Sequence, residues 1–295
     1  MTNNYIVAQL PFNISCQDDM DIGMLLPSLD NFKAEKIDEP IFSLVIDNSL
    51  SPSKHRQLMK DSDTGNGVIS VYTTDNGDRE FIIKDIGGRH CCLLQTNEDY
   101  SKCRCALNGT KGMISFGLND AIMIAYAFAA CRHSALLIHA SCVCKDGWAY
   151  PFIAESGTGK STHSAKWMNA IEDVQLLNDD NPVLRVIDGI AYVFGSPWSG
   201  KTPCYRNKQC QLGALVHIKR DNTNHCEPMR PYIAFANMLS SCSSMTWDKH
   251  IHNSVCDTIS VILQSTRMYT MHCLPDDQAA LICFDTVGRN KQLFI

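Results

Sequence analysis

The fold class predicted from the sequence is α/β, with a β-rich N-terminal module at residues 1–117 and a second domain at residues 118–295. In the first third, short apolar runs are separated by turn residues, as is typical of hairpins. After Ala135, apolar runs alternate with helical segments. One of these runs leads into a glycine-rich loop that a helix follows, which is the pattern of an α/β unit.

Turn chemistry predicts the elements of the N-terminal module. Apolar runs at residues 41–46, 67–72 and 80–83 are expected strands, and Asn76-Gly77 forms the tight turn between the last two. Asn119 then precedes the run AIMIAYAFAACR and is suited to cap a helix. We therefore expect a buried helix that begins near Asn119.

The second domain begins with two expected strands, ALLIHASCVC and WAYPFIAE, the second of which leads into the glycine loop. A helix at residues 161–170 and the short strand VQLLND follow the loop. The runs VLRVIDG and IAYVFG read as a hairpin. A further strand is expected at 213–219, with helices at 231–241, 254–267 and 276–280.

Composition favours a protein without a nucleic-acid or membrane partner. Apolar residues make up 45% of the chain and charged residues 19%, which is close to the globular average. The 26 basic and 31 acidic residues give a net charge of −5, and no basic block occurs. No uninterrupted apolar run approaches the roughly 18 residues of a membrane span.

Fifteen cysteines are the unusual feature of the composition. No Cys-x-x-Cys pair occurs, so the common zinc spacings are absent. Free cysteine is among the most buried residue types, which favours reduced packing residues over a metal cluster or disulfides. The first ten residues do not read as a secretory signal, so we expect a cytoplasmic protein.

The sharpest motif is the run AESGTGKS, which begins at Ala154 and has the form of a Walker A phosphate-binding loop (P-loop). Gly157 and Gly159 let backbone N–H groups point at phosphate oxygens, and Lys160 supplies a positive charge. Ser161 is suited to bind Mg²⁺. The expected nucleotide contacts are Ser156, Gly157, Thr158, Gly159, Lys160, Ser161 and Thr162. The alternative is a glycine turn without function.

Two carboxylates follow the next apolar strand, in the sequence Asn178-Asp179-Asp180-Asn181. In phosphoryl transfer, one carboxylate commonly orients Mg²⁺ while another accepts the proton of the attacking hydroxyl. Alone, the sequence would read as a solvated turn. Behind a phosphate loop, it indicates that Asp179 and Asp180 are metal-binding and catalytic residues.

Three further residues are weaker catalytic candidates. His139 lies in an apolar run upstream of the loop, where it is either a packed core residue or a polar group beside the phosphates. Lys201 and Arg206 lie in the segment GSPWSGKTPCYRN, which also contains Cys204, a thiol that could be reactive. These two cations are expected either to stabilise a transferred phosphoryl group or to lie in a solvated loop.

Four motifs in order, HASCV, AESGTGKSTHS, LNDDNPV and GSPWSGK, resemble the catalytic domain of the HPr serine kinase/phosphorylase family. This family is related in fold to ATP-dependent phosphoenolpyruvate carboxykinase. The resemblance covers about residues 135–220 and implies a mixed-sheet P-loop core that uses ATP and Mg²⁺. By the resemblance, His139, Lys160 and Ser161 match family site residues, and Asp179/Asp180 match its aspartate pair.

The resemblance implies a kinase that transfers the γ-phosphoryl group of ATP to a hydroxyl of a small molecule, peptide or protein. The first third does not resemble the usual N-terminal domain of the family, and GSPWSGK replaces a family signature, which argues against HPr as the acceptor. Two alternatives are a nucleotide-binding regulatory protein and a phosphorylase that releases pyrophosphate. Relatives assemble, so a homo-oligomer is one state that the resemblance allows.

Overall fold

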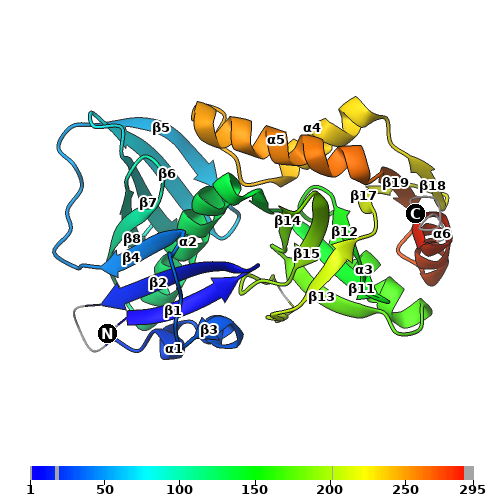
Figure 1. Ribbon diagram of the computed structural model, residues 1–295, viewed down its shortest axis with the longest axis horizontal. Helices are drawn as coiled ribbons and strands as arrows, with labels where there is room; N and C mark the ends of the chain where they lie inside the picture. Colours follow the sequence, from blue (N-terminus) through cyan, green and yellow to red (C-terminus); the bar gives the residue numbers. More distant parts are fainter. Residues whose placement is uncertain (1, 17–19, 201, 289–295) are drawn as a thin grey trace. The chain divides into compact units, whose positions relative to one another are not determined.

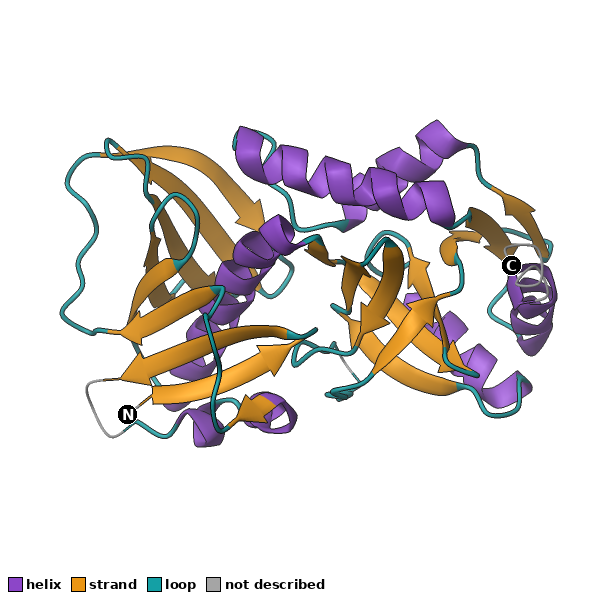
Figure 2. Ribbon diagram, viewed as in Figure 1, coloured by secondary structure: helices purple, strands orange, loops and turns teal. Residues whose placement is uncertain are grey.

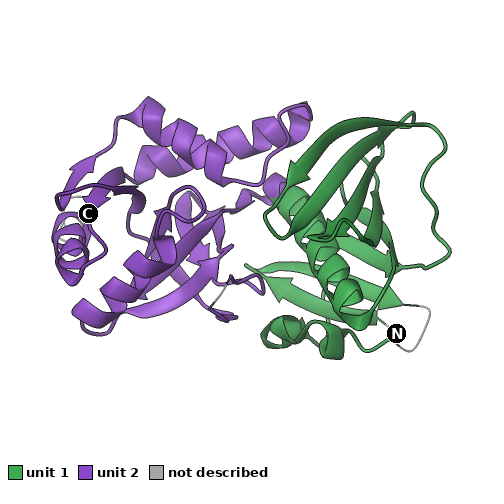
Figure 3. Cartoon of the chain, turned by 180° about the vertical axis from the view of Figure 1, so that it is seen from behind, with its two compact units in different colours: residues 1–130 green, residues 131–295 purple. Residues whose placement is uncertain are grey.

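The computed structural model describes residues 2–16, 20–200 and 202–288 (Figure 1). The chain forms two compact units, Met1–Ala130 and Cys131–Ile295 (Figure 3). Each unit combines strands with helices, as Figure 2 shows, and each contains a mixed sheet. The predicted α/β class is confirmed.

Unit 1 is built on a nine-stranded sheet with the order β3-β1-β2-β4-β9-β8-β7-β6-β5. The β2–β4 and β4–β9 pairs are parallel and the other pairs antiparallel. The expected Asn76-Gly77 turn joins β6 and β7. The strands are β1 (Thr2–Val7), β2 (Leu10–Cys16), β3 (Lys33–Ala34), β4 (Phe42–Ile46), β5 (Arg56–Asp63), β6 (Gly67–Thr74), β7 (Arg79–Asp85), β8 (His90–Thr96) and β9 (Lys102–Leu107).

One long helix, α2 (Lys111–Ala130), packs on β7, β8 and β9 of this sheet, and the short helices are α1 (Ile22–Leu25) and η1 (Pro27–Phe32). Phe128 of α2 stacks on Phe81 and contacts Tyr100. Because α2 belongs to unit 1, the division between the units falls at Ala130 and not at residue 117. By length and composition the segment 111–133 could cross a membrane, but 72% of its most apolar window is buried inside the structure.

Helix α2 begins eight residues before the expected cap, so the prediction that Asn119 starts the helix is wrong. Asn119 lies inside the helix, and its amide donates to the Asp120 carboxylate. Gly117 lies inside α2, where the helix comes close to β8. A Cβ atom at Gly117 would lie 2.9 Å from the Cys91 backbone of β8, so glycine permits close packing of helix on strand.

Unit 2 contains a mixed sheet whose main path is β10-β14-β15-β16-β12-β17-β19-β18. Strand β12 is parallel to both β16 and β17, and β17 is parallel to β19. Strand β11 pairs with β12 and β13. The strands are β10 (Ala135–Leu137), β11 (Ala140–Lys145), β12 (Trp148–Ile153), β13 (Gln175–Asp180), β14 (Val183–Ile187), β15 (Ile190–Phe194), β16 (Gln209–Leu212), β17 (Leu215–Arg220), β18 (His225–Pro228) and β19 (Met268–Cys273).

The helices of unit 2 are η2 (Cys131–His133), α3 (Lys160–Ala170), α4 (Pro231–Ser241), α5 (Lys249–Ser265) and α6 (Asp277–Gly288). Helix α5 starts five residues before the prediction because the Asp248 side chain accepts from the N–H groups of His250 and Ile251. Trp167 of α3 is fully buried against Tyr150 and Phe152 of β12. This contact fixes α3, and hence the loop before it, on the sheet.

Candidate active site

The loop at residues 154–159 joins the carboxyl end of β12 to the first residue of α3, as the sequence predicts. Gly157 and Gly159 have φ values of +77° and +122°, which side-chain-bearing residues rarely adopt. The N-terminus of a helix carries unpaired N–H groups and a partial positive charge. The loop and the start of α3 therefore have the form of an anion-binding site.

Lys160 is buried at the start of α3, and its ammonium group donates to the Ala154 carbonyl at 3.0 Å. Burial lowers the pKa of Lys160, while the charges of Asp180 and Asp179 counteract this effect. Lys160 thus lies within electrostatic reach of both predicted carboxylates. Ser161 and Thr162 follow it in the first turn and are exposed.

Asp179 is buried at the end of β13 and is fixed by Ser141 of the neighbouring strand β11. The Ser141 hydroxyl donates to Asp179 Oδ1 at 2.7 Å, and Ser141 Oγ lies 2.6 Å from Ser164 Oγ of α3. The carboxylate is therefore tied through one serine to the helix that begins at Lys160.

Asp180 is more accessible, with 37% of its side chain exposed, and its Oδ1 lies 3.3 Å from His139 Nε2. The expected strand through His139 is interrupted, because the chain leaves β10 after Leu137 and enters β11 at Ala140. At the interruption, the His139 N–H donates to the Ser241 carbonyl. His139 is therefore a half-exposed polar residue beside Asp180 and not a packed core residue.

Asn178 is a structural residue of the site that the sequence analysis did not identify. Its buried side-chain oxygen accepts from the N–H groups of Asp180 and Asn181, and its amide donates to Ser196 and to the Trp198 carbonyl. The amide thus fixes the turn after β13 against the segment that follows β15. The sequence signal that could have identified Asn178 is its position as a polar residue directly before the aspartate pair.

The structure does not bring Arg206 to the loop. Its guanidinium donates to Gln175 at the opposite end of β13 from Asp180. Five residues of strand at about 3.3 Å each separate these ends by roughly 16 Å. The expected role of Arg206 at the phosphoryl group is therefore corrected, while Lys201 lies outside the described residues.

Arg220, at the end of β17, is a loop contact that the sequence analysis missed. Its guanidinium donates to the carbonyls of Thr158 and Gly157. Since β17 runs parallel to β12, both strands end at the same edge of the sheet. The parallel pairing places Arg220 beside the loop, and only the strand order could have predicted it.

A cavity of about 240 Å³ adjoins the first residues of the loop. Its walls come from four parts of unit 2: the β10–β11 connection, the end of β12, β17 and the last turns of α4. The polar residues that line it are His139, Glu155, His217, Asn237, Ser240 and Ser241. The cavity offers room for a polar group next to His139.

The oxygen groups present suit Mg²⁺ better than a transition metal. Within the described residues, no three His, Cys, Asp or Glu side chains are grouped to hold a metal. Mg²⁺ usually takes one or two carboxylates, waters and substrate phosphates, so it does not need such a group. Ser161 and the carboxylates of Asp179 and Asp180 are of the matching chemical type.

Cys204, the cysteine of the GSPWSGKTPCYRN segment, is a buried thiol. All fifteen are free thiols in the described part of the chain, twelve of them buried and three partly buried. Burial raises the pKa of Cys204, with nearby Arg206 lowering it in part. A raised pKa makes the thiolate scarce, so the geometry does not support a reactive Cys204.

No protein-family model matches the chain, and no curated protein matches it. Among solved structures, the HPr(Ser) kinase/phosphatase from Coxiella burnetii aligns with a TM-score of 0.31 and 13% identity. The alignment covers 53% of this chain and 96% of that chain. A similarity of this size does not establish family membership.

Proposed function

We propose that the protein is an ATP- and Mg²⁺-dependent phosphotransferase, a kinase that passes the γ-phosphoryl group to a hydroxyl acceptor. The observation that carries the proposal is the position of Lys160. The buried ammonium group lies at the base of the glycine loop and within the electrostatic influence of both Asp179 and Asp180. A phosphate loop facing two carboxylates has the parts that phosphoryl transfer requires.

Each residue has a role in this proposal. The loop amides and Lys160 bind the phosphates and offset negative charge that develops during transfer. Asp180 is the proposed base, because its carboxylate is accessible and lies beside His139, a residue that lines the 240 Å³ cavity. There it would accept the proton of the attacking hydroxyl.

Asp179 is the proposed metal-orienting residue, together with Ser161. The bond from Ser141 holds the Asp179 carboxylate in one orientation. When bound, Mg²⁺ would supply positive charge for the phosphate oxygens. The buried thiols suit a reducing compartment, so we propose a cytoplasmic location for this activity.

The test compares the full chain with Lys160→Ala and with Lys166→Ala, a lysine on the same helix that pairs with Asp277 instead. Two quantities are measured: binding of a fluorescent ATP analogue with Mg²⁺, and turnover of γ-labelled ATP, with water taking the place of the acceptor. We expect binding and slow turnover in the parent and in Lys166→Ala, and the loss of both in Lys160→Ala.

Other outcomes favour other functions. A parent protein that does not bind the analogue, or a Lys160→Ala variant that binds it equally, contradicts the nucleotide site. Binding without turnover, also against a panel of hydroxyl acceptors, favours a regulatory nucleotide-binding protein. Release of pyrophosphate from a phosphorylated acceptor in the presence of phosphate favours a phosphorylase.

A further inference from the structure

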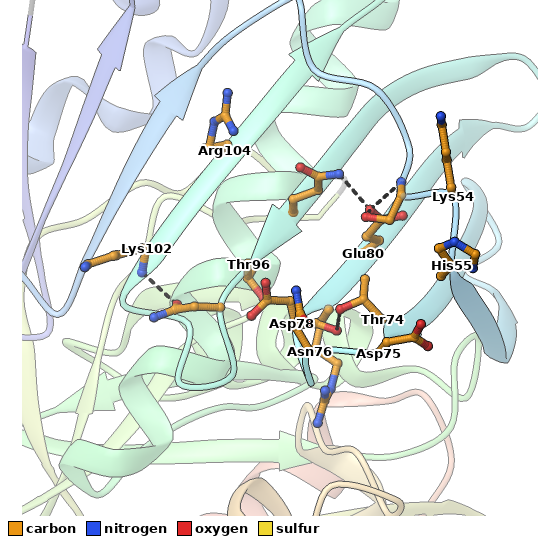
Figure 4. A pocket seen from close by; sticks show the side chains of 14 residues that line it. Lys54, His55, Thr74, Asp75, Asn76, Asp78, Glu80, Thr96, Lys102 and Arg104 are labelled. Carbon is orange, nitrogen blue, oxygen red and sulfur yellow. Dashed lines mark hydrogen bonds between the residues drawn. The ribbon is translucent and has the colours of Figure 1, made fainter.

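Unit 1 contains a cavity of about 540 Å³ that the proposed function does not use (Figure 4). It lies where the segment before β5, the β6–β7 turn, the end of β8 and the start of β9 come together. Its volume is within the roughly 300–1,000 Å³ of small-molecule sites. It is therefore large enough to be a binding site of its own.

One wall of the cavity is held by a buried carboxylate. Glu80 is 0% exposed, and it accepts hydrogen bonds from the Ser53 N–H and hydroxyl, from Arg56 and from Gln95. Burial acts to raise the pKa of Glu80, but these hydrogen bonds lower it below its usual range. The carboxylate stays ionised and fastens the segment before β5 to the sheet, so the wall is ordered before any ligand arrives.

The charged groups at the mouth of the cavity are of both signs. Figure 4 shows Lys102 on one side and Lys54 with His55 on the other, with Asp75 and Asp78 of the turn between them. Within the described residues, the ammonium groups of Lys54 and Lys102 and the two turn carboxylates have no salt-bridge partner. By contrast, Arg104 of the same cavity pairs with Asp47.

This lining discriminates between classes of ligand. A neutral sugar would be expected to meet an aromatic platform, and no aromatic ring except the His55 imidazole is among the lining residues. A phosphate or other simple anion could pair with the lining cations but would leave the carboxylates of Asp75 and Asp78 without a partner. A ligand with an ammonium and a carboxylate group satisfies both sets of charges, and amide groups of a peptide have Asn76 and Asn97 available.

We propose that this cavity binds a zwitterionic ligand of the amino-acid or short-peptide type, with its ammonium group at Asp75 and Asp78 and its carboxylate at Lys54 or Lys102. The proposal does not rest on the phosphotransferase activity, since every residue involved belongs to unit 1. It gives the N-terminal unit a recognition function of its own.

Calorimetric titration of the full chain tests the proposal, with triglycine, glycine, N-acetyl-triglycine amide, inorganic phosphate and sucrose as probes. Lys54→Met/Lys102→Met removes the cations and Asp75→Asn/Asp78→Asn removes the anions. The matched controls are Lys36→Met and Asp61→Asn, which alter exposed residues of unit 1 outside the cavity. All the substitutions are at surface side chains, and circular dichroism checks that each variant is folded.

We expect triglycine to bind, and each double variant to weaken binding by about tenfold or more, as expected for the loss of charge-assisted hydrogen bonds. Capping both termini of the peptide, as in N-acetyl-triglycine amide, should weaken binding to a similar extent. The control variants should change the affinity for triglycine less than about twofold. Stronger binding of glycine than of triglycine identifies a free amino acid as the ligand, and the reverse identifies a peptide. The proposal is overturned if neither zwitterion binds, if the double variants bind like the controls, or if phosphate or sucrose binds in their place.

Discussion

Ser141 donates a hydrogen bond to Asp179 at 2.7 Å. Through Ser141, the strand that carries the aspartate pair is joined to the helix that follows the glycine loop. Ser141 lies opposite Asp179 in the β11–β13 ladder, and its oxygen also lies 2.6 Å from that of Ser164, one turn after Lys160. A displacement of α3 therefore changes the surroundings of Asp179. Lys160 of the loop and Asp179, the proposed metal-orienting residue, are positioned as one unit.

Replacing Ser141 tests this link. Ser141→Ala removes the donor to a buried carboxylate, which is expected to cost about 1–3 kcal/mol of folding stability. We also expect turnover to fall about tenfold and the Mg²⁺ concentration for half-maximal turnover to rise, because Asp179 loses its fixed orientation. Turnover against Mg²⁺ concentration measures this, with Ser260→Ala on the exposed face of α5 as control. An unchanged Mg²⁺ dependence would show that Ser141 has only a structural role.

Asp180 and Asp179 should fail in different ways. Asp180→Asn keeps the size of the side chain but removes the proposed base, so we expect a loss of turnover of about 10²–10⁴-fold with little change in nucleotide affinity. Asp179→Asn should instead weaken Mg²⁺-dependent binding. Rates and affinities of the two variants, measured on the same preparations, decide the assignment. If Asp180→Asn retains parental turnover, Asp180 is not the base.

Arg220 should stabilise the loop conformation that binds phosphate. Its two hydrogen bonds reach the carbonyls of Thr158 and Gly157, so Arg220→Met frees the loop and adds an ordering cost to nucleotide binding. We expect affinity for the ATP analogue to fall about three- to tenfold. Lys219→Met, which removes the neighbouring exposed cation, is the control for net charge. Equal losses in both variants would mean that the effect is long-range attraction and not loop positioning.

The sequence was informative where a motif is continuous along the chain. The strand, glycine loop and helix around Lys160, and the aspartate pair at the end of β13, lie where local patterns predicted them. The sequence did not predict the position of a residue where that position depends on pairing between strands that are distant in the chain. Arg206 lies in a motif near the site in sequence, yet the segment after β15 brings it to Gln175, at the opposite end of β13 from Asp180. By contrast, the parallel pairing of β17 with β12 brings Arg220 to the loop.

Acid should destabilise unit 2 through His163. Burial lowers the pKa of His163 to about 4, and its Nε2 accepts from the Trp167 indole. In the unfolded chain the pKa is about 6.5, so between these values only the unfolded state binds the proton. The contribution of neutral His163 to the folding stability of unit 2 is therefore fully present above pH 6.5. It is lost as the pH falls towards 4, by roughly 3 kcal/mol at most.

Urea unfolding followed by tryptophan fluorescence measures this dependence, because all four tryptophans lie in residues 131–295. His163→Gln should flatten the decline in stability between pH 7 and pH 4.5, even if the variant is less stable at every pH. His250→Gln, at an exposed histidine, should leave it unchanged. Parallel pH curves for the parent and His163→Gln would contradict the assignment.

Unit 1 should show the opposite dependence through Asp120 of α2. Burial raises the pKa of Asp120 to about 6, and the hydrogen bond from Asn119 lowers it only in part. A carboxyl group with a raised pKa favours the folded state at low pH, and this stability is lost as the pH rises through 6.

Asp120→Asn keeps an acceptor for Asn119 without the buried charge. We expect it to stabilise unit 1 by about 1–3 kcal/mol at pH 8 and to have almost no effect at pH 4. Hydrogen exchange of the α2 amides in the full chain measures the gain, with Asp61→Asn at an exposed carboxylate as control. Equal exchange rates in Asp120→Asn and the parent at pH 8 would mean that Asp120 carries no buried charge. Slower exchange in the variant than in the parent at both pH 4 and pH 8 would assign the gain in stability to packing instead of ionisation.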